Sequence, residues 1–289
     1  MKPDSRFLRQ ATTFWANVRA ISETAGYTER GKGVVKAPTL SEMLSAMNTR
    51  DLGVEHIVDK KGKPTDLGND LVAYFSYRAK VLNDHVEPRL MDVKRAKAEF
   101  NKLRKALKPT PDCPMPMNKQ KKAKKAAAYL TCMVNMIVEA HSKGFQCDYD
   151  PQALTTVTSN GAPLGTLSRR MDGAFLSTVN PIAIWEIKEY YHTTTFGSRV
   201  ADGVYETLLD GMELAELNKC EGVDVLHYLI LDSHYTWWES GGRPYLCRIL
   251  DAMHMGYIDE VLFGYEVIER LPAIVRQWVR AAKTRKQVD

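Results

Sequence analysis

The chain has 289 residues, of which 44% are hydrophobic, so it can bury one or two cores of ordinary size. A formal net charge of +5 makes it mildly basic, which by itself selects no partner. No apolar run approaches the roughly 18 residues that span a bilayer, and the first residues lack the apolar core of a signal peptide. Five scattered cysteines without a Cys-x-x-Cys pair indicate reduced thiols, so we expect a cytoplasmic protein with no zinc site and no membrane partner.

Residues 1–110 are predicted to form a helical N-terminal region. Apolar residues recur at helical spacing from Phe7 to Ile21, and a glycine-rich polar loop over residues 26–33 follows. Thr39 and Glu42 fit a capping box, and long helix continues to residue 107 with a break near Pro88. This region either contacts DNA or mediates dimerisation, or it is a helical subdomain that packs on the rest of the chain. The pattern favours packing.

Lysine and arginine residues concentrate on both sides of a proline-rich segment, residues 109–116. The first group lies within residues 94–108 and the second within residues 119–125. The prolines predict a boundary, with a second domain over residues 111–289. Such charge runs form solvated surface, and in a DNA-binding protein they also supply affinity for phosphates. The two interpretations are compatible. The candidate DNA-binding residues in the second group are Lys119, Lys121 and Lys122.

The central feature of the second domain is a short apolar run, residues 182–185, followed by the charged residues Glu186 and Lys188. Its β-branched and aromatic residues predict a strand, and its continuous apolar character predicts burial on both faces. Side chains alternate along a strand, so Glu186 and Lys188 point to the same face. Residues 172–175 predict the partner strand of a hairpin with its turn at residues 177–180. This pairing brings Asp172 close to Glu186 and Lys188.

Two carboxylates and an ammonium group at the end of a buried strand have a chemical use. Hard divalent cations such as Mg²⁺ bind carboxylate oxygens, waters and phosphate oxygens. A metal held there stabilises charge on a phosphodiester in transition and lowers the pKa of a bound water. An ordinary ion pair at a strand edge uses the same residue types. Charges that end a buried run need partners, however, and this favours a functional site.

Asp172 and the tripeptide Glu186-Ile187-Lys188, fourteen positions later, resemble the Asp…Glu-x-Lys signature of the PD-(D/E)xK nuclease superfamily, which includes most type II restriction endonucleases. The resemblance covers about residues 130–235, and Met171 stands where a proline is expected. It implies an α/β fold with a restriction-endonuclease-like core, a small mixed sheet flanked by helices, beside the helical N-terminal portion. It also implies that Asp172 and Glu186 bind Mg²⁺ and that Lys188 assists the attacking water. The implied substrate is double-stranded DNA, and the implied assembly is a homodimer.

Residues around the signature have candidate roles as well. Glu139, near the end of the helix before the first core strand, is either an auxiliary catalytic carboxylate, as the resemblance implies, or a surface carboxylate. Arg169 and Arg170 lie just before the aspartate and either contact phosphate or pair with acidic groups. His192 and Arg199 follow in a polar segment and are candidate DNA contacts. A general-base role for His192 is less expected, because this superfamily does not need a histidine.

The remaining elements complete an α/β pattern. Residues 145–149 predict an edge strand, and residues 199–218 an amphipathic helix. The apolar run 225–232 predicts a second core strand, and the helix before it predicts a crossover to a parallel neighbour. A helix over residues 245–255, a strand over 258–263 and a basic helix over 271–286 follow.

The function expected from these features is Mg²⁺-dependent, sequence-specific cleavage of DNA. Three alternatives stay open. The first is a repair, phage or defence nuclease of the same superfamily with little sequence preference. The second is a DNA-binding protein without catalysis, and the third is a different enzyme in which Glu186 and Lys188 form an ordinary ion pair.

Overall fold

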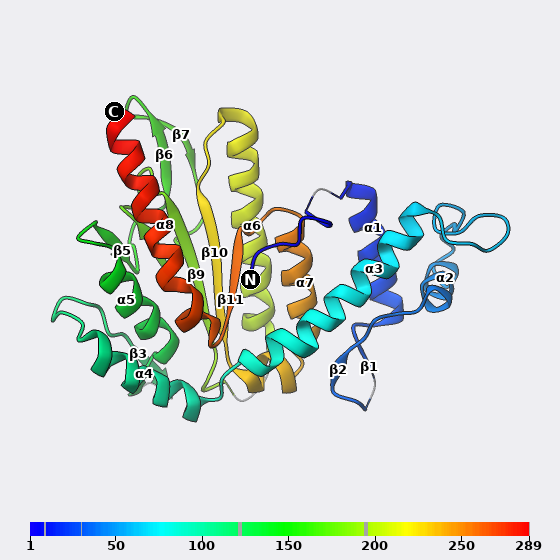
Figure 1. Ribbon diagram of the computed structural model, residues 1–289, viewed down its shortest axis with the longest axis horizontal. Coiled ribbons are helices and arrows are strands. Elements are labelled where there is room, and N and C mark those ends of the chain that lie inside the picture. The colour runs from blue at the N-terminus through cyan, green and yellow to red at the C-terminus, as the bar shows by residue number, and fades with distance from the viewer. Residues whose placement is uncertain (9, 30, 121–122, 194–195, 289) are drawn as a thin grey trace.

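The computed structural model describes residues 1–8, 10–29, 31–120, 123–193 and 196–288 (Figure 1). At its centre lies a mixed sheet with the strand order β11-β10-β9-β8-β5. The first three of these strands are parallel, and β8 and β5 run antiparallel to their neighbours. The predicted α/β class with a small mixed sheet is therefore confirmed. The strands are β5 (Cys147–Tyr149), β8 (Gly173–Phe175), β9 (Ala183–Glu189), β10 (Leu226–Asp232) and β11 (Glu260–Phe263).

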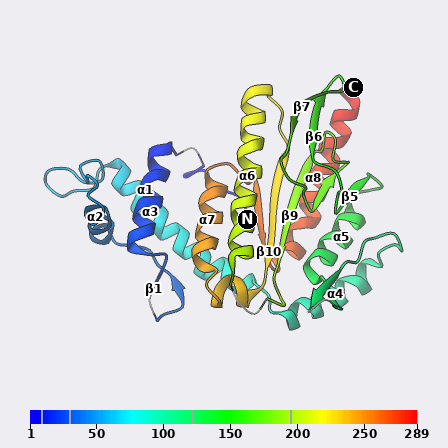
Figure 2. The same ribbon diagram turned by 180° about the vertical axis from the view of Figure 1, so that it is seen from behind.

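Helices cover both faces of this sheet, which explains the continuous apolar run of β9. On one face, Trp185 of β9 stacks on Trp278 of α8 with ring centroids 5.6 Å apart, and α5 packs beside α8. On the other face, Ile184 joins a buried cluster with Leu214 of α6. The two sides of the molecule are seen in Figures 1 and 2. The helices are α5 (Tyr129–His141), α6 (Ser198–Glu221), α7 (Arg243–His254) and α8 (Glu266–Val288).

Two connections predicted from the sequence are confirmed in the sheet. β8 and β9 form an antiparallel hairpin in which Gly173 lies opposite Trp185. α6 then carries the chain from β9 to β10, and these two strands are parallel, with Glu189 opposite Asp232. A helical crossover is the ordinary connection between parallel strands. The hairpin therefore places β8 on one side of β9, and the crossover places β10 on the other.

The described residues between Phe7 and Val81 form a helical unit with its own apolar cluster, which includes Phe14, Met43 and Phe75. Thr39 begins α2 with the predicted capping box. The glycine-rich segment, expected to be a loop, contains a short antiparallel hairpin. The elements are α1 (Thr12–Ala25), β1 (Thr28–Glu29), β2 (Val34–Val35), α2 (Leu40–Asn48) and α3 (Asp66–Val81).

A buried ion pair joins the helical unit to the α/β part, since Arg78 of α3 lies 3.0 Å from Asp251 of α7. After α3, a π-helical turn over Leu82–Val86 and a 3-10 turn over Glu87–Arg89 produce the predicted break near Pro88. The basic helix α4 (Val93–Leu107) packs Phe100 against Tyr129 of α5. By its contacts, α4 therefore belongs with the α/β part.

Two further hairpins lie outside the central sheet. The first carries Lys119, Lys124 and Lys125 of the second lysine group, and the second lies beside α6. Among the helices in the described ranges, none combines the length and apolar character needed to cross a membrane. The hairpin strands are β3 (Met117–Gln120) with β4 (Ala123–Ala127), and β6 (Thr156–Ser159) with β7 (Ala162–Thr166).

Candidate active site

The β8–β9 hairpin holds Asp172 at the end of β9. The backbone N–H of Asp172 donates to the carbonyl of Trp185 at 3.1 Å, and its Oδ2 accepts from the N–H of Ile187 at 2.7 Å. Gly173 permits this close pairing, because a Cβ atom at that position would lie 2.0 Å from the Trp185 ring. The structure thus brings Asp172 next to Glu186 at one edge of a polar cavity.

Glu186 and Lys188 lie on the face of β9 that α6 covers, and they are only 3% and 8% exposed. The Nζ atom of Lys188 lies 2.5 Å from Oε1 of Glu186. Gly203 of α6 allows the helix to come close, since a Cβ atom there would lie 3.0 Å from Cε of Lys188. These charged side chains are therefore packed under a helix, unlike the solvated pair of a strand edge.

Arg169, Glu206 and Asp210 extend this pair into a charged network. Arg169 places Nη2 2.8 Å from Oε1 of Glu186 and Nη1 2.7 Å from Oδ2 of Asp210. Glu206, one helical turn before Asp210, lies 3.2 Å from Nζ of Lys188. Of the two roles that the sequence leaves open for Arg169, the structure shows the pairing with acidic groups.

This network holds more carboxylates than cations. Burial raises the pKa of Asp172 to about 7, and the nearby charge of Glu186 adds to the effect. Burial also raises the pKa of Asp210 to about 7, although the guanidinium group of Arg169 opposes it. Among the described residues, Oε2 of Glu186 and Oδ1 of Asp210 are buried without a hydrogen-bond partner. Such unpartnered oxygens are costly, so the network is short of hydrogen-bond donors or cations.

A cavity of about 490 Å³ opens beside the network and is lined by residues of β3, α5, β9 and α6. Asp172, Glu186 and Lys188 contribute to the lining, and so does Glu189 from the opposite face of β9. The backbone N–H of Thr131, in the first turn of α5, donates to Oε2 of Glu189 at 3.1 Å. Burial raises the pKa of Glu189 above its usual value. Carboxylates from two faces of the sheet therefore meet at one cavity.

Glu139, the predicted auxiliary catalytic residue, is not brought to this cavity. It follows Thr131 by eight positions on α5, which corresponds to about 12 Å along the helix axis. Its carboxylate accepts hydrogen bonds from the backbone N–H of Thr110 at 3.1 Å and from the Thr110 hydroxyl group. The first turn of α5 meets the cavity, so a residue near the other end of the helix lies away from it.

The other predicted DNA-binding residues whose side chains the structure describes are exposed. Arg199 is exposed and lines the cavity from the first turn of α6, and His192 is exposed in the turn after β9. Arg170 is exposed and places Nη1 2.7 Å from Oε1 of Gln152. Lys119 belongs to β3, and Lys121 and Lys122 lie outside the described residues.

The oxygen donors of the cavity suit a hard cation. Within the described ranges, no group of three His, Cys, Asp or Glu side chains is arranged to hold a metal by itself. Mg²⁺, however, often takes one or two carboxylates and completes its shell with waters and substrate phosphate oxygens. Asp172 and Glu186 supply two carboxylates, and one oxygen of Glu186 is buried without a partner. The residues present therefore fit Mg²⁺ bound in that way.

Sequence reasoning missed three acidic residues of the site, namely Glu189, Glu206 and Asp210. Glu206 and Asp210 are four positions apart, so they share one face of α6, and this spacing is a signal in the sequence. Glu189 points to the face of β9 opposite Glu186 and Lys188. The sequence gives no reason to expect a functional carboxylate on that face. The role of Glu189 emerges only when α5 and β3 are placed against it.

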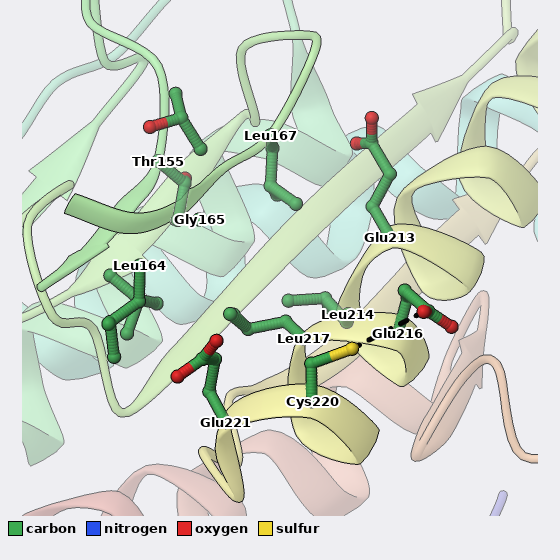
Figure 3. A pocket seen from close by; sticks show the side chains of 12 residues that line it. Thr155, Leu164, Gly165, Leu167, Glu213, Leu214, Glu216, Leu217, Cys220 and Glu221 are labelled. Carbon is green, nitrogen blue, oxygen red and sulfur yellow. Dashed lines mark hydrogen bonds between the residues drawn. The ribbon is translucent and has the colours of Figure 1, made fainter.

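A second cavity, of about 440 Å³, lies between the β6–β7 hairpin and the C-terminal half of α6 (Figure 3). Figure 3 shows Leu164 and Leu167 on one side of it and Leu214, Leu217 and Glu221 of α6 on the other. Its lining is mainly apolar, and it lacks the buried ion pairs of the first cavity. The candidate active site is therefore the polar cavity at the end of β9.

Two family models match the chain, and both describe domains of unknown function. DUF7690 matches residues 1–85 and DUF7687 matches residues 91–278. The two matches adjoin at the break between α3 and α4, upstream of the boundary that the prolines predict. No curated protein and no solved structure matches the chain. Because the longer match covers more than half of its residues, the protein belongs to the family described as Domain of unknown function (DUF7687).

Proposed function

We propose that the protein is an Mg²⁺-dependent endonuclease that hydrolyses phosphodiester bonds of double-stranded DNA. The observation that carries the proposal is the convergence of Asp172, Glu186 and Lys188 beside a polar cavity. A surface ion pair does not require burial, and it leaves no carboxylate oxygen buried without a partner. The cluster therefore favours a bound cation.

Asp172 and Glu186 would hold this cation. When bound, Mg²⁺ supplies positive charge that stabilises the phosphodiester in transition and lowers the pKa of a bound water. Asp172 binds metal in its ionised form, and a pKa near 7 means that burial resists ionisation until positive charge is present. The chain thus has a carboxyl group whose charge state responds to cation binding.

Lys188 is proposed to orient the attacking water and to stabilise charge on the phosphate. Burial lowers the pKa of its ammonium group, but the charge and hydrogen bond of Glu186 outweigh burial and raise the pKa above its usual value. Lys188 therefore stays protonated at neutral pH. A protonated ammonium group donates hydrogen bonds and stabilises negative charge, so it acts by orientation and electrostatics and not as a general base.

Basic residues on the same part of the chain support a nucleic-acid substrate. The lysine-rich hairpin β3–β4 reaches the cavity, because Asn118 of β3 donates to Oε1 of Glu189 at 2.8 Å. α4, which packs on α5, carries exposed basic residues. Charges of this kind supply phosphate affinity that does not depend on base sequence. The exposed set on α4 includes Lys94, Lys97, Lys102, Arg104 and Lys105.

Sequence specificity, a restriction-endonuclease-like core and a homodimer belong to the same proposal and rest on the resemblance to type II restriction endonucleases. A small mixed sheet with helices on both faces is the architecture that this resemblance implies, and it supports the proposal. A two-fold protein dimer would match the two-fold symmetry of a palindromic DNA site.

The test is cleavage of plasmid DNA with Mg²⁺ by the wild type and by Asp172→Ala and Lys188→Ala. We expect discrete fragments from the wild type and rates at least about 100-fold lower in both variants, because each removes a group that acts in the transition state. Glu216→Gln is the matched control. Glu216 is an exposed carboxylate on α6 that pairs with Lys219, so this variant should cleave like the wild type.

The outcomes separate the alternatives. A smear in place of fragments, lost in the same two variants, would keep the catalytic centre but make the protein a nuclease with little sequence preference. DNA binding that needs no metal, with no cleavage, would indicate a binding protein. No cleavage by folded wild type, or equal cleavage by all four proteins, would remove the nuclease proposal and leave the cluster as a structural ion network.

A further inference from the structure

A cleft between the helical unit and the α/β part has the size and chemistry of a ligand site. It holds about 440 Å³ and is lined by α1 and Tyr27 on one side, and by α6 and α7 on the other. Small-molecule pockets measure about 300–1,000 Å³ and favour the junctions between structural units. The residues that carry the inference are Arg19, Tyr27, Tyr205, Leu208 and Arg248.

Arg248 of α7 lines this cleft between aromatic rings. Its Cζ atom lies 5.1 Å from the ring centroid of Tyr27 and 4.7 Å from that of Tyr245. Burial lowers its pKa, but the neighbouring tyrosines outweigh burial and raise it, so the guanidinium group stays charged. Its guanidinium group also forms a hydrogen bond with the Tyr27 side chain, and among the described residues no carboxylate forms an ion pair with it. Its positive charge is therefore available to an anion.

Arg19 of α1 adds a second guanidinium group to the lining. It is exposed, and Nη2 lies 3.4 Å from the sulfur of Met255, a weak acceptor. The lining also contains two carboxylates, and both are already paired, Glu23 with Arg50 at 2.6 Å and Asp251 with Arg78 at 3.0 Å. Guanidinium groups present a planar fork of donors that matches phosphate oxygens. Two of them at one cleft favour an anionic ligand.

Aromatic and apolar side chains form the rest of the wall. Tyr205 of α6 is 51% exposed, and its ring centroid lies 6.4 Å from that of Tyr245. Leu208, one turn later on α6, lines the same cleft. An exposed aromatic face beside a cation is a platform on which a planar ring can stack. The cleft therefore offers a stacking surface next to an anion site.

We propose that this cleft binds a nucleotide, with its phosphate at Arg248 and Arg19 and its base against Tyr205 and Leu208. A simple anion would leave the aromatic wall unused, and an apolar ligand would desolvate two guanidinium groups without a partner. A nucleotide has a phosphate for the two guanidinium groups and a planar base for the aromatic and apolar side chains. A free mononucleotide and a nucleotide within an unpaired strand present the same groups. This proposal rests on the cleft alone and does not depend on the nuclease activity.

The test is calorimetric titration of the full chain with AMP, adenosine, inorganic phosphate and a single-stranded oligonucleotide. AMP should bind the wild type, and adenosine and phosphate should each bind at least about tenfold more weakly, because each lacks one half of the contacts. Arg248→Gln and Tyr205→Ala should each weaken AMP binding by a similar factor. Arg243→Gln is the control, because Arg243 also belongs to α7 but lies 5.6 Å from the Trp238 ring and outside the cleft lining.

Two variants at different positions in the cleft, Arg248→Gln and Tyr205→Ala, test the same binding site. Tyr205 is half exposed, so Tyr205→Ala should fold even if Arg248→Gln does not. An oligonucleotide that binds more tightly than AMP and loses affinity in the same variants would assign the ligand to a strand. Failure of both AMP and the oligonucleotide to bind folded wild type would overturn the proposal, as would equal affinities for all variants.

Discussion

Nη2 of Arg169 lies 2.8 Å from Oε1 of Glu186, so a carboxylate proposed to bind metal already carries a cation. The same oxygen accepts a hydrogen bond from Lys188 at 2.5 Å, while Oε2 is buried with no partner among the described residues. Oε1 of Glu186 therefore contacts two cations, whereas Oε2 contacts none among the described residues. A cation bound through Oε2 requires neither existing contact to break, which is why metal binding is the most direct property to measure.

Mg²⁺ should raise the melting temperature of the wild type and leave that of Asp172→Asn nearly unchanged. A ligand that binds only the native state stabilises it by about 1.4 kcal/mol at ten times its dissociation constant, which corresponds to a few degrees for a chain of this size. Calorimetry with and without Mg²⁺ at a pH above 7, where Asp172 ionises, measures this shift. Glu216→Gln should respond like the wild type. Equal shifts in all three proteins would place the metal elsewhere.

Gly173→Ala should destabilise the protein and slow cleavage. Its Cβ atom would lie 2.0 Å from the buried Trp185 ring, and overpacking of this kind costs about 1–3 kcal/mol. The displaced backbone would also move Asp172, so we expect cleavage at least about tenfold slower. Gly53→Ala is the control, because its Cβ atom meets only the Glu55 carboxylate, at 2.8 Å, and the cost should stay within about 0.5 kcal/mol. Urea unfolding that shows equal stability for the two variants would contradict this account.

Arg78→Ala should be among the most destabilising single changes in the helical unit. Arg78 is 1% exposed, and its removal would leave the buried carboxylate of Asp251 without its cation, at a cost of about 3–5 kcal/mol. Arg50→Ala removes an ion pair with Glu23 that is exposed, so its cost should lie within about 1 kcal/mol. Denaturant unfolding measures both. A loss for Arg78→Ala no greater than for Arg50→Ala would show that this contact does not hold the two parts together.

Asp232 should make the wild type less stable as pH rises from about 4 to about 7. Burial raises the pKa of Asp232 to about 7 in the folded protein, against an ordinary value of 3.8. Between these values the native state binds more protons than the unfolded state, so the free energy of unfolding falls with rising pH. Asp232→Asn keeps an oxygen for the backbone N–H groups of Met91 and Ser233 but does not titrate.

The measurement is the difference in unfolding free energy between Asp232→Asn and the wild type at several pH values. This difference should grow in favour of the asparagine variant as pH rises from 4 toward 7 and level off above the folded-state pKa. Parallel stability curves for the two proteins across this range would show that Asp232 is already ionised at low pH.

The sequence alone was sufficient for the strand that organises the site and for the pairing around it. The apolar run of β9 and its alternation place Glu186 and Lys188 on one face, and the short connection to β8 brings Asp172 to the same end. The crossover through α6 to a parallel β10 also followed from local pattern. These features depend on periodicity and on chain segments that are close in sequence, which is the information that a single sequence carries.

Only the tertiary structure decided which other charges surround that strand end. Arg169 and Asp210 meet because α6 presents one particular face to β9, and this rotation is set by side-chain packing across the whole interface. The helix α5 brings its first turn to the cavity, so Thr131 holds Glu189 there while Glu139 lies about two turns away. Helix rotation and direction are fixed by packing among distant segments, and local sequence pattern does not determine them.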